Sequence, residues 1–64
     1  MKKYLYDVTY CDTRNGDEKT MTVLVDGGDY YACILVMREV HEYGRFVRSK
    51  FIREVPEHEW KNYE

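Results

Sequence analysis

The residue types that commonly catalyse reactions or bind metals are few in this chain, and their spacing does not group them. The imidazoles are His41 and His58, which lack the i, i+4 spacing that places two zinc ligands on one helix face. The candidate nucleophiles are Cys11, Cys33 and Ser49, and no Cys-His or Ser-His arrangement can be read from their positions. The sequence therefore predicts a protein with no metal site, no cofactor and no enzymatic activity.

Clustered positive charge is the second feature that could indicate a binding site. Four cations fall within a short stretch near the carboxyl end: Arg45, Arg48, Lys50 and Arg53. Basic and aromatic residues on an open sheet face can bind single-stranded nucleic acid, and Phe46, Arg48 and Lys50 are the candidates here. Protection of an exposed edge strand by lysine and arginine is the preferred explanation of the same residues, and Asp7 would repel phosphate. Nucleic-acid binding is therefore the alternative hypothesis.

The length and composition of the chain limit the class of protein to which it can belong. The chain has 64 residues, enough for one domain, and a formal net charge of -2, whereas nucleic-acid-coating proteins are normally basic. A domain of this size buries only about 60% of the surface that its unfolded chain exposes, so it commonly relies on a disulfide, a metal or a second copy. Two cysteines without CxxC spacing predict reduced thiols and a cytoplasmic location, with a Cys11–Cys33 disulfide as the alternative. We expect no signal peptide and no membrane span, because Asp7 interrupts the first apolar run.

The first 25 residues predict a β-hairpin. "KYLYDVTYCD" and "KTMTVLV" alternate with a period of two, which is typical of half-buried strands. Asn15-Gly16 between them tolerates positive φ and is a strong turn signal. We expect Met21, Val23 and Val25 to face the core, and Thr20, Thr22 and Leu24 to face away.

Residues 29–43 predict a helix, and a third strand of an all-β meander is the alternative. The run "YYACILV" is rich in strand formers, but it does not alternate as a half-exposed strand should. Asp26 or Asp29 could cap the amino end, and Gly44 is placed to be the left-handed residue after the last turn. The helical interpretation is the preferred one.

The last strand and the tail complete the predicted fold. In "RFVRSKFIREV", strict alternation puts Val47, Phe51 and Val55 on one face and Phe46, Arg48, Lys50 and Ile52 on the other, and Pro56 ends the strand. We expect an α+β fold with the order β-β-α-β, a three-stranded antiparallel sheet of order 2-1-3, and one helix on one face. Residues 1–56 would form the domain and residues 57–64 a carboxy-terminal tail, which leaves the second sheet face without cover from the chain.

The predicted helix carries more apolar surface than one sheet face can bury. A helical wheel places Tyr30, Cys33, Met37 and Val40 on the core side of the helix, with Val36 near them. We expect this stripe to pack against core residues of the strands, Phe51 among them. Ile34 and Leu35 lie elsewhere, beside Tyr31, although burying a large aliphatic side chain is worth about 1.5–3 kcal/mol. The tail, a second copy of the chain or another protein could cover them. The predicted partner-binding residues are Tyr31, Ile34, Leu35, Trp60 and Tyr63.

The segments "YDVTYCDTRNGDEKTMTVLV", "GGDYYACILVMREV" and "RFVRSKFIREV" together resemble the small orphan β-β-α-β proteins of phages and other mobile elements. The resemblance implies an accessory protein that acts by binding, a class that includes inhibitors of host defence such as the anti-CRISPR proteins. The leading hypothesis is a non-catalytic protein-binding module, homodimeric, acting in the host cytoplasm.

Overall fold

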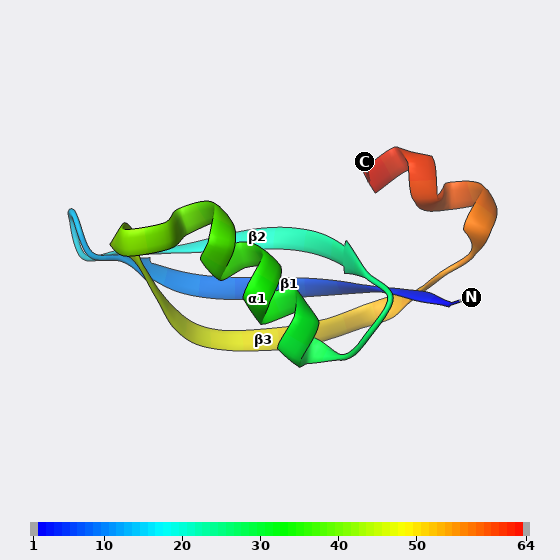
Figure 1. Cartoon of the computed structure of the whole chain (residues 1–64), viewed down its shortest axis with the longest axis horizontal. Helices are drawn as coiled ribbons and strands as arrows, with labels where there is room; N and C mark the ends of the chain where they lie inside the picture. Colours follow the sequence, from blue (N-terminus) through cyan, green and yellow to red (C-terminus); the bar gives the residue numbers. More distant parts are fainter. Residues whose placement is uncertain (1, 64) are drawn as a thin grey trace.

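In the computed structural model, which describes residues 2–63, two strands, a helix and a third strand follow one another (Figure 1). The elements are β1 (Lys3–Asp12), β2 (Asp17–Val25), α1 (Asp29–Val40), β3 (Gly44–Val55) and two 3-10 helices, η1 (His41–Tyr43) and η2 (Glu57–Tyr63). The sheet order is β2-β1-β3, both pairings are antiparallel, and α1 lies across one face. The predicted fold class is confirmed. Met1 and Glu64, the outer ends of the predicted domain and tail, lie outside the described residues.

The turn of the hairpin follows the expected chemistry. Gly16 has φ +79°, and its backbone N–H donates to the Asp12 carbonyl at 2.7 Å. The Asn15 side chain accepts the Asp17 N–H at 3.0 Å. The register that results pairs Tyr6 with Val23 without a bulge between β1 and β2.

The helix is rotated relative to the predicted wheel. The buried cluster is made of Val8, Tyr10, Val25, Ala32, Val36 and Val40. Ala32, Val36 and Val40 repeat every four residues and form the core stripe of α1, whereas Tyr30 is 70% exposed. Tyr30 lies two residues before Ala32, roughly 200° around the helix axis, so the prediction that it faces the core is wrong.

The predicted helix begins at Asp29 as expected, but the residues that cap its two ends differ from the prediction. The amino-terminal cap is Gly28 and no side chain caps it, so neither Asp26 nor Asp29 has that role. Asp29 is instead the first helical residue, where its negative charge interacts favourably with the positive end of the helix dipole. At the other end, His41 takes the positive φ, +52°, and its N–H donates to the Met37 carbonyl.

Gly44 is not the left-handed residue that the sequence suggested, since its φ is -111° and it begins β3. Its lack of a side chain serves a close approach instead. A Cβ built at Gly44 would overlap the Val40 side chain, which is fully buried at the end of α1. Glycine therefore allows the chain to turn from the helix into the sheet directly against Val40.

Two bulges break the alternation of β3. The register against β1 shifts between Leu5 and Tyr6 and again between Thr9 and Tyr10, which leaves Ile52 and Val47 as the extra residues. The cross-strand pairs that follow are Tyr10 with Phe46, Val8 with Ser49, Tyr6 with Phe51, Thr9 with Arg48, Asp7 with Lys50 and Lys3 with Val55. Phe46 and Phe51 consequently lie on the helix side of the sheet.

The faces predicted for β3 are therefore wrong in two respects. Phe46 does not share a face with Arg48 and Lys50, and Val55 does not share one with Phe51. Phe51 is also 52% exposed rather than part of the core. The helix has 12 residues and is about 18 Å long, so it cannot cover a strand of 12 residues that extends roughly 40 Å.

The second sheet face, which we call the open face, is covered at one end by η2. The Trp60 Nε1–H donates to the Val55 carbonyl at 2.9 Å, and the Lys3 ammonium lies 4.5 Å from the centre of the Trp60 ring. Arg53 donates to Glu59 at 2.9 Å and to the Tyr63 hydroxyl at 3.1 Å. The tail thus folds back onto the sheet, and the expectation of a second face without cover is wrong at this end.

The close approach at Gly44 gives a stability prediction. Gly44→Ala should lower the free energy of unfolding by about 1–3 kcal/mol, because the added methyl group overlaps a buried valine that has little room to move. Urea unfolding followed by circular dichroism measures the loss. Gly28→Ala is the matched control, since a Cβ there meets nothing within 4 Å, and it should cost less than about 1 kcal/mol. Equal stability of Gly44→Ala and the parent chain would contradict the close packing.

Candidate protein-binding surface

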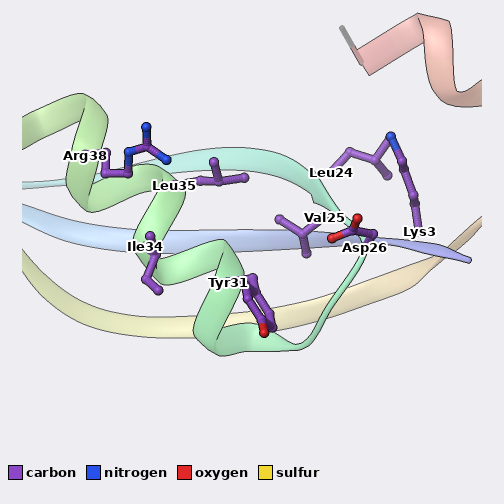
Figure 2. A pocket seen from close by; sticks show the side chains of 8 residues that line it. All are labelled: Lys3, Leu24, Val25, Asp26, Tyr31, Ile34, Leu35 and Arg38. Carbon is purple, nitrogen blue, oxygen red and sulfur yellow. The ribbon is translucent and has the colours of Figure 1, made fainter.

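Three of the predicted partner-binding residues meet in one groove (Figure 2). The groove has a volume of about 310 Å³ and lies between α1 and the end of β2. Its lining residues are Lys3, Leu24, Val25, Asp26, Tyr31, Ile34, Leu35 and Arg38. The structure therefore brings Tyr31, Ile34 and Leu35 together, as the sequence predicted, and adds Leu24 from the strand.

Helical spacing explains why these side chains share one surface. Tyr31, Ile34, Leu35 and Arg38 are separated by three or four residues, so they lie on one side of α1, away from the Ala32–Val36–Val40 stripe. Leu35 is 42% exposed and Ile34 is half-buried. Residues 2–63 leave both side chains partly exposed. The tail brings Tyr63 near Leu35 but does not provide the full cover that was one of the expected alternatives.

Tyr31 has a defined place in this groove. A Cβ built at Gly27 would overlap the Tyr31 ring, which shows that the ring lies directly against the backbone before the helix. The Tyr30 ring meets it edge to face, with the two ring centres 5.8 Å apart. Because Gly27 has no side chain, the Tyr31 ring can pack against its backbone, while more than half of the Tyr31 surface stays exposed to solvent.

A second groove continues the first along the outer edge of β2. Its volume is about 280 Å³ and its lining residues are Met21, Thr22, Val23, Leu24, Leu35, Glu39 and Tyr63. Leu24 and Leu35 line both grooves, so the two are contiguous. We call the two grooves together the β2 surface. The four consecutive strand residues belong to an edge strand, because within residues 2–63 β2 pairs with β1 alone.

Four of the five predicted partner-binding residues line the β2 surface, and one does not. Tyr31, Ile34, Leu35 and Tyr63 line the β2 surface, with Tyr63 reaching it from η2. Trp60 does not, since it is half-buried and its N–H is bonded to Val55. Sequence reasoning missed the β2 edge itself, although the uncharged run at residues 20–25, with Leu24 facing away from the core, was a usable signal.

The residues of the alternative nucleic-acid site are divided between the two sheet faces. Arg48 and Lys50 lie on the open face, where Arg48 approaches Glu18 at 3.6 Å and Lys50 pairs across the strands with Asp7. The Asp7 carboxylate also accepts a hydrogen bond from Thr22 at 2.6 Å. Phe46 lies on the helix side. The three candidates therefore do not form a single basic and aromatic platform.

The cysteines are both free and lie on different sides of the sheet. Cys11 pairs across the strands with Glu18 and Arg45 on the open face, whereas Cys33 is on α1. Burial raises the pKa of the Cys33 thiol, which lowers its reactivity. Within residues 2–63, no three side chains of His, Cys, Asp or Glu are grouped so that they could hold a metal ion.

No protein-family model, no curated protein and no solved structure matches this sequence. The resemblance to phage and mobile-element proteins therefore stays a prediction. Among the described residues, no helix combines the length and the apolar character that crossing a membrane requires.

The most strongly perturbed titratable group lies at the hairpin end of the molecule and is structural. The Asp12 side chain is fully buried and accepts hydrogen bonds from the Arg14 Nε and Nη2 atoms, at 3.0 and 2.8 Å, and from Lys19 at 3.3 Å. The hydrogen bond from Arg14 is the largest cause that holds the pKa of the Asp12 carboxyl well below its usual range, although burial opposes it. The Arg14 guanidinium in turn stacks on the Tyr43 ring, 3.7 Å from its centre. This cluster joins the hairpin turn to η1.

The lowered pKa of Asp12 predicts a defined loss of stability in acid. A carboxyl whose folded pKa lies below its unfolded value stabilises the fold above about pH 4, and that contribution is lost as the pH falls through the folded pKa. Asp12→Asn should therefore be less stable than the parent at neutral pH, and the difference should shrink as the pH falls below 4. Urea midpoints measured across this range test it. Arg14→Gln should reproduce part of the effect, and a difference that does not change with pH would contradict the assignment.

Proposed function

We propose that this protein is a non-catalytic protein-protein interaction module, and that the β2 surface binds an extended segment of another protein. The supporting observation is that four residues predicted as partner-binding, from two separate elements, line contiguous grooves along one strand edge that has no partner strand among residues 2–63. The surface therefore offers an unpaired backbone edge together with apolar hollows.

Strand addition is the binding mode that suits this arrangement. An added strand gains backbone hydrogen bonds from the free edge, and its alternate side chains turn to opposite faces of the sheet. Side chains of the added strand that point to the helix side would contact Leu35 and Glu39, and side chains that point to the open face would contact Tyr63. The edge is also regular and uncharged over residues 20–25, because β1 and β2 pair without a bulge. The fitting partner segment is apolar at alternate positions.

Burial of the exposed side chains supplies the affinity in this proposal. Covering Tyr31 and Leu35 removes from water two large side chains that are now about half exposed, and full burial of such a side chain is worth about 1.5–3 kcal/mol. Tyrosine suits such a position, since its hydroxyl tolerates water in the free protein and its ring contributes area in the complex. Arg38 and Glu39 at the rim would contribute orientation more than affinity.

The proposed setting follows from the resemblance and not from the geometry. We propose that the chain is an accessory protein of a phage or another mobile element, and that it acts in the host cytoplasm by occupying a surface of a host protein and inhibiting or modulating it. Binding nucleic acid through the open face has less support, because Arg48 and Lys50 are balanced by Glu18 and Asp7.

Differential capture tests the interaction surface. The tagged chain should retain a host protein from a lysate of its native cell, and Leu35→Lys should lose that protein because it places a charge where both grooves meet. The matched control is Arg48→Glu combined with Lys50→Glu, which alters exposed residues on the open face and should retain the same protein. Circular dichroism confirms that both variants fold. Capture that survives Leu35→Lys but fails in the control would contradict the proposal.

A labelled single-stranded oligonucleotide tests the alternative. Fluorescence anisotropy should show no binding at micromolar protein. Binding through several phosphates would instead appear as an affinity that falls by about 10³–10⁵ between roughly 50 and 200 mM salt. If the wild type binds in that salt-dependent manner and the Arg48→Glu, Lys50→Glu chain does not, nucleic-acid binding replaces the proposed function.

A further inference from the structure

Another hollow lies on the β3 side of α1, away from the β2 surface. Its volume is about 230 Å³, and its lining residues are Asp29, Tyr30, Cys33, Phe46 and Ser49. We call it the aromatic hollow. The first turn of α1 provides Asp29 and Tyr30, and β3 lies beside that turn in Figure 1.

We propose that the aromatic hollow binds a cationic side chain, an arginine or a lysine, from a segment of another protein. The size of the hollow favours a single side chain, since sites for drug-sized ligands usually enclose about 300–1,000 Å³. The lining favours a cation, because one carboxylate and two aromatic rings attract positive charge by ion pairing and by cation–π contact. This site is independent of the proposed function, because it shares no lining residue with the β2 surface.

Both aromatic side chains of the hollow are accessible to a ligand. Tyr30 is 70% exposed and Phe46 is 43% exposed. They belong to different elements, α1 and β3, so an aromatic side chain lines the hollow on each side. The face of an aromatic ring attracts a cation within about 6 Å of its centre. Arginine suits such a site well, because its flat guanidinium group stacks on aromatic rings and also pairs with a carboxylate.

Asp29 supplies the negative charge of the hollow. Within residues 2–63 it takes part in no ion pair, so no lysine or arginine side chain neutralises its carboxylate. The charge of Asp29 also acts inside the hollow, since it is the second cause, after burial, that raises the pKa of the Cys33 thiol. The amino end of the helix opposes a bound cation with only about half a positive charge, which is less than the full charge of Asp29.

The cations of β3 lie on the other face of the sheet. Pairing with β1 puts four of them on the open face: Arg45, Arg48, Lys50 and Arg53. The paired residues whose side chains lie on the helix side are Phe46, Ser49, Phe51 and Glu54. Lys2 already approaches Glu54 at 3.8 Å, so Asp29 is the acid that remains for a ligand. The helix side of the strand is therefore aromatic and acidic, which complements a cationic segment.

Aromatic surface beyond the hollow favours a protein segment over a free cation. Phe51 follows Ser49 by two residues on the same face of the sheet and is 52% exposed. The centre of its ring lies 5.6 Å from that of Tyr6 and 6.3 Å from that of Tyr4. A segment whose cation fills the hollow can cover Phe51 with a neighbouring residue and gain apolar contact there. A free cation would gain only the contacts inside the hollow.

Nuclear magnetic resonance of the isotope-labelled full chain tests the site. The probe is a capped peptide of alternating serine and arginine, used at about 10 mM salt, where exposed charges act over about 30 Å. The amide signals of the lining residues should shift as the peptide is added. A peptide with citrulline in place of arginine keeps the shape but has no charge, so it should bind at least about fivefold more weakly.

Two variants test the charge and the ring separately. Asp29→Asn removes the charge with little change in size and should weaken binding of the arginine peptide by about fivefold. Tyr30→Leu should weaken it by about two- to fivefold, and its exposed position leaves the fold intact. The matched control is Asp26→Asn, which removes a charge three residues earlier but lines the β2 surface, and it should bind like the parent chain. Circular dichroism confirms that each variant is folded.

Several results would overturn the site: no shift of the lining residues, shifts confined to the open face, equal binding of the citrulline peptide, or unchanged affinity in both Asp29→Asn and Tyr30→Leu. The proposed function has a separate readout. A chain that captures a host protein in a Leu35-dependent way but does not bind the arginine peptide refutes the cation site alone. A chain that binds the arginine peptide but captures nothing refutes the proposed target binding alone.

Discussion

The contact of α1 with the sheet through Ala32, Val36 and Val40 determines the remaining surfaces of the molecule. These side chains are small and follow one another every four residues, so the helix packs closely against Val8 and Tyr10, and all five side chains are buried. A stripe of this kind is narrow. The apolar residues on either side of it cannot reach the sheet centre, and they emerge towards β2 on one flank and towards β3 on the other.

A three-stranded sheet with one helix has more surface to protect than the chain can cover. It has two faces and two edges, and η2 covers only the end of the open face near Val55. The remaining part of that face is polar and internally paired, since Thr9 is hydrogen-bonded to Thr20 at 3.0 Å, Asp7 to Thr22, and Arg48 approaches Glu18. The exposed apolar side chains are therefore concentrated along the two edges, where unpaired backbone groups are also found.

Sequence periodicity sufficed for the elements and their order, but not for the rotation of the helix or the faces of β3. Alternation in β1 and β2 and the Asn15-Gly16 turn are local signals, and a helix between strands of this length leaves few topologies. The run "YYACILV" has no polar residue to mark its solvent side, so a wheel cannot distinguish a stripe through Ala32 from one through Tyr30. A bulge adds one residue without any change in composition, so the displacement of Phe46 to the helix side was not visible in the pattern.

The candidate site was partly predictable for the same reason. Tyr31, Ile34 and Leu35 were identified because they are surplus to any single core stripe, whichever way the helix turns, and the structure places them in one groove. Trp60 lies apart from the β2 surface, because the tail returns to the sheet and the indole N–H donates to the Val55 carbonyl. A contact of this kind between neighbouring segments has no periodic signature in the sequence. Edge strands are likewise defined only by topology, since nothing local to β2 or β3 says that its partner on one side is missing. Once the order β2-β1-β3 is known, both edges become the places where a small domain can gain the burial that its own core lacks. The two edges differ in chemistry, since β2 is uncharged and regular over residues 20–25, whereas β3 is basic, aromatic and bulged.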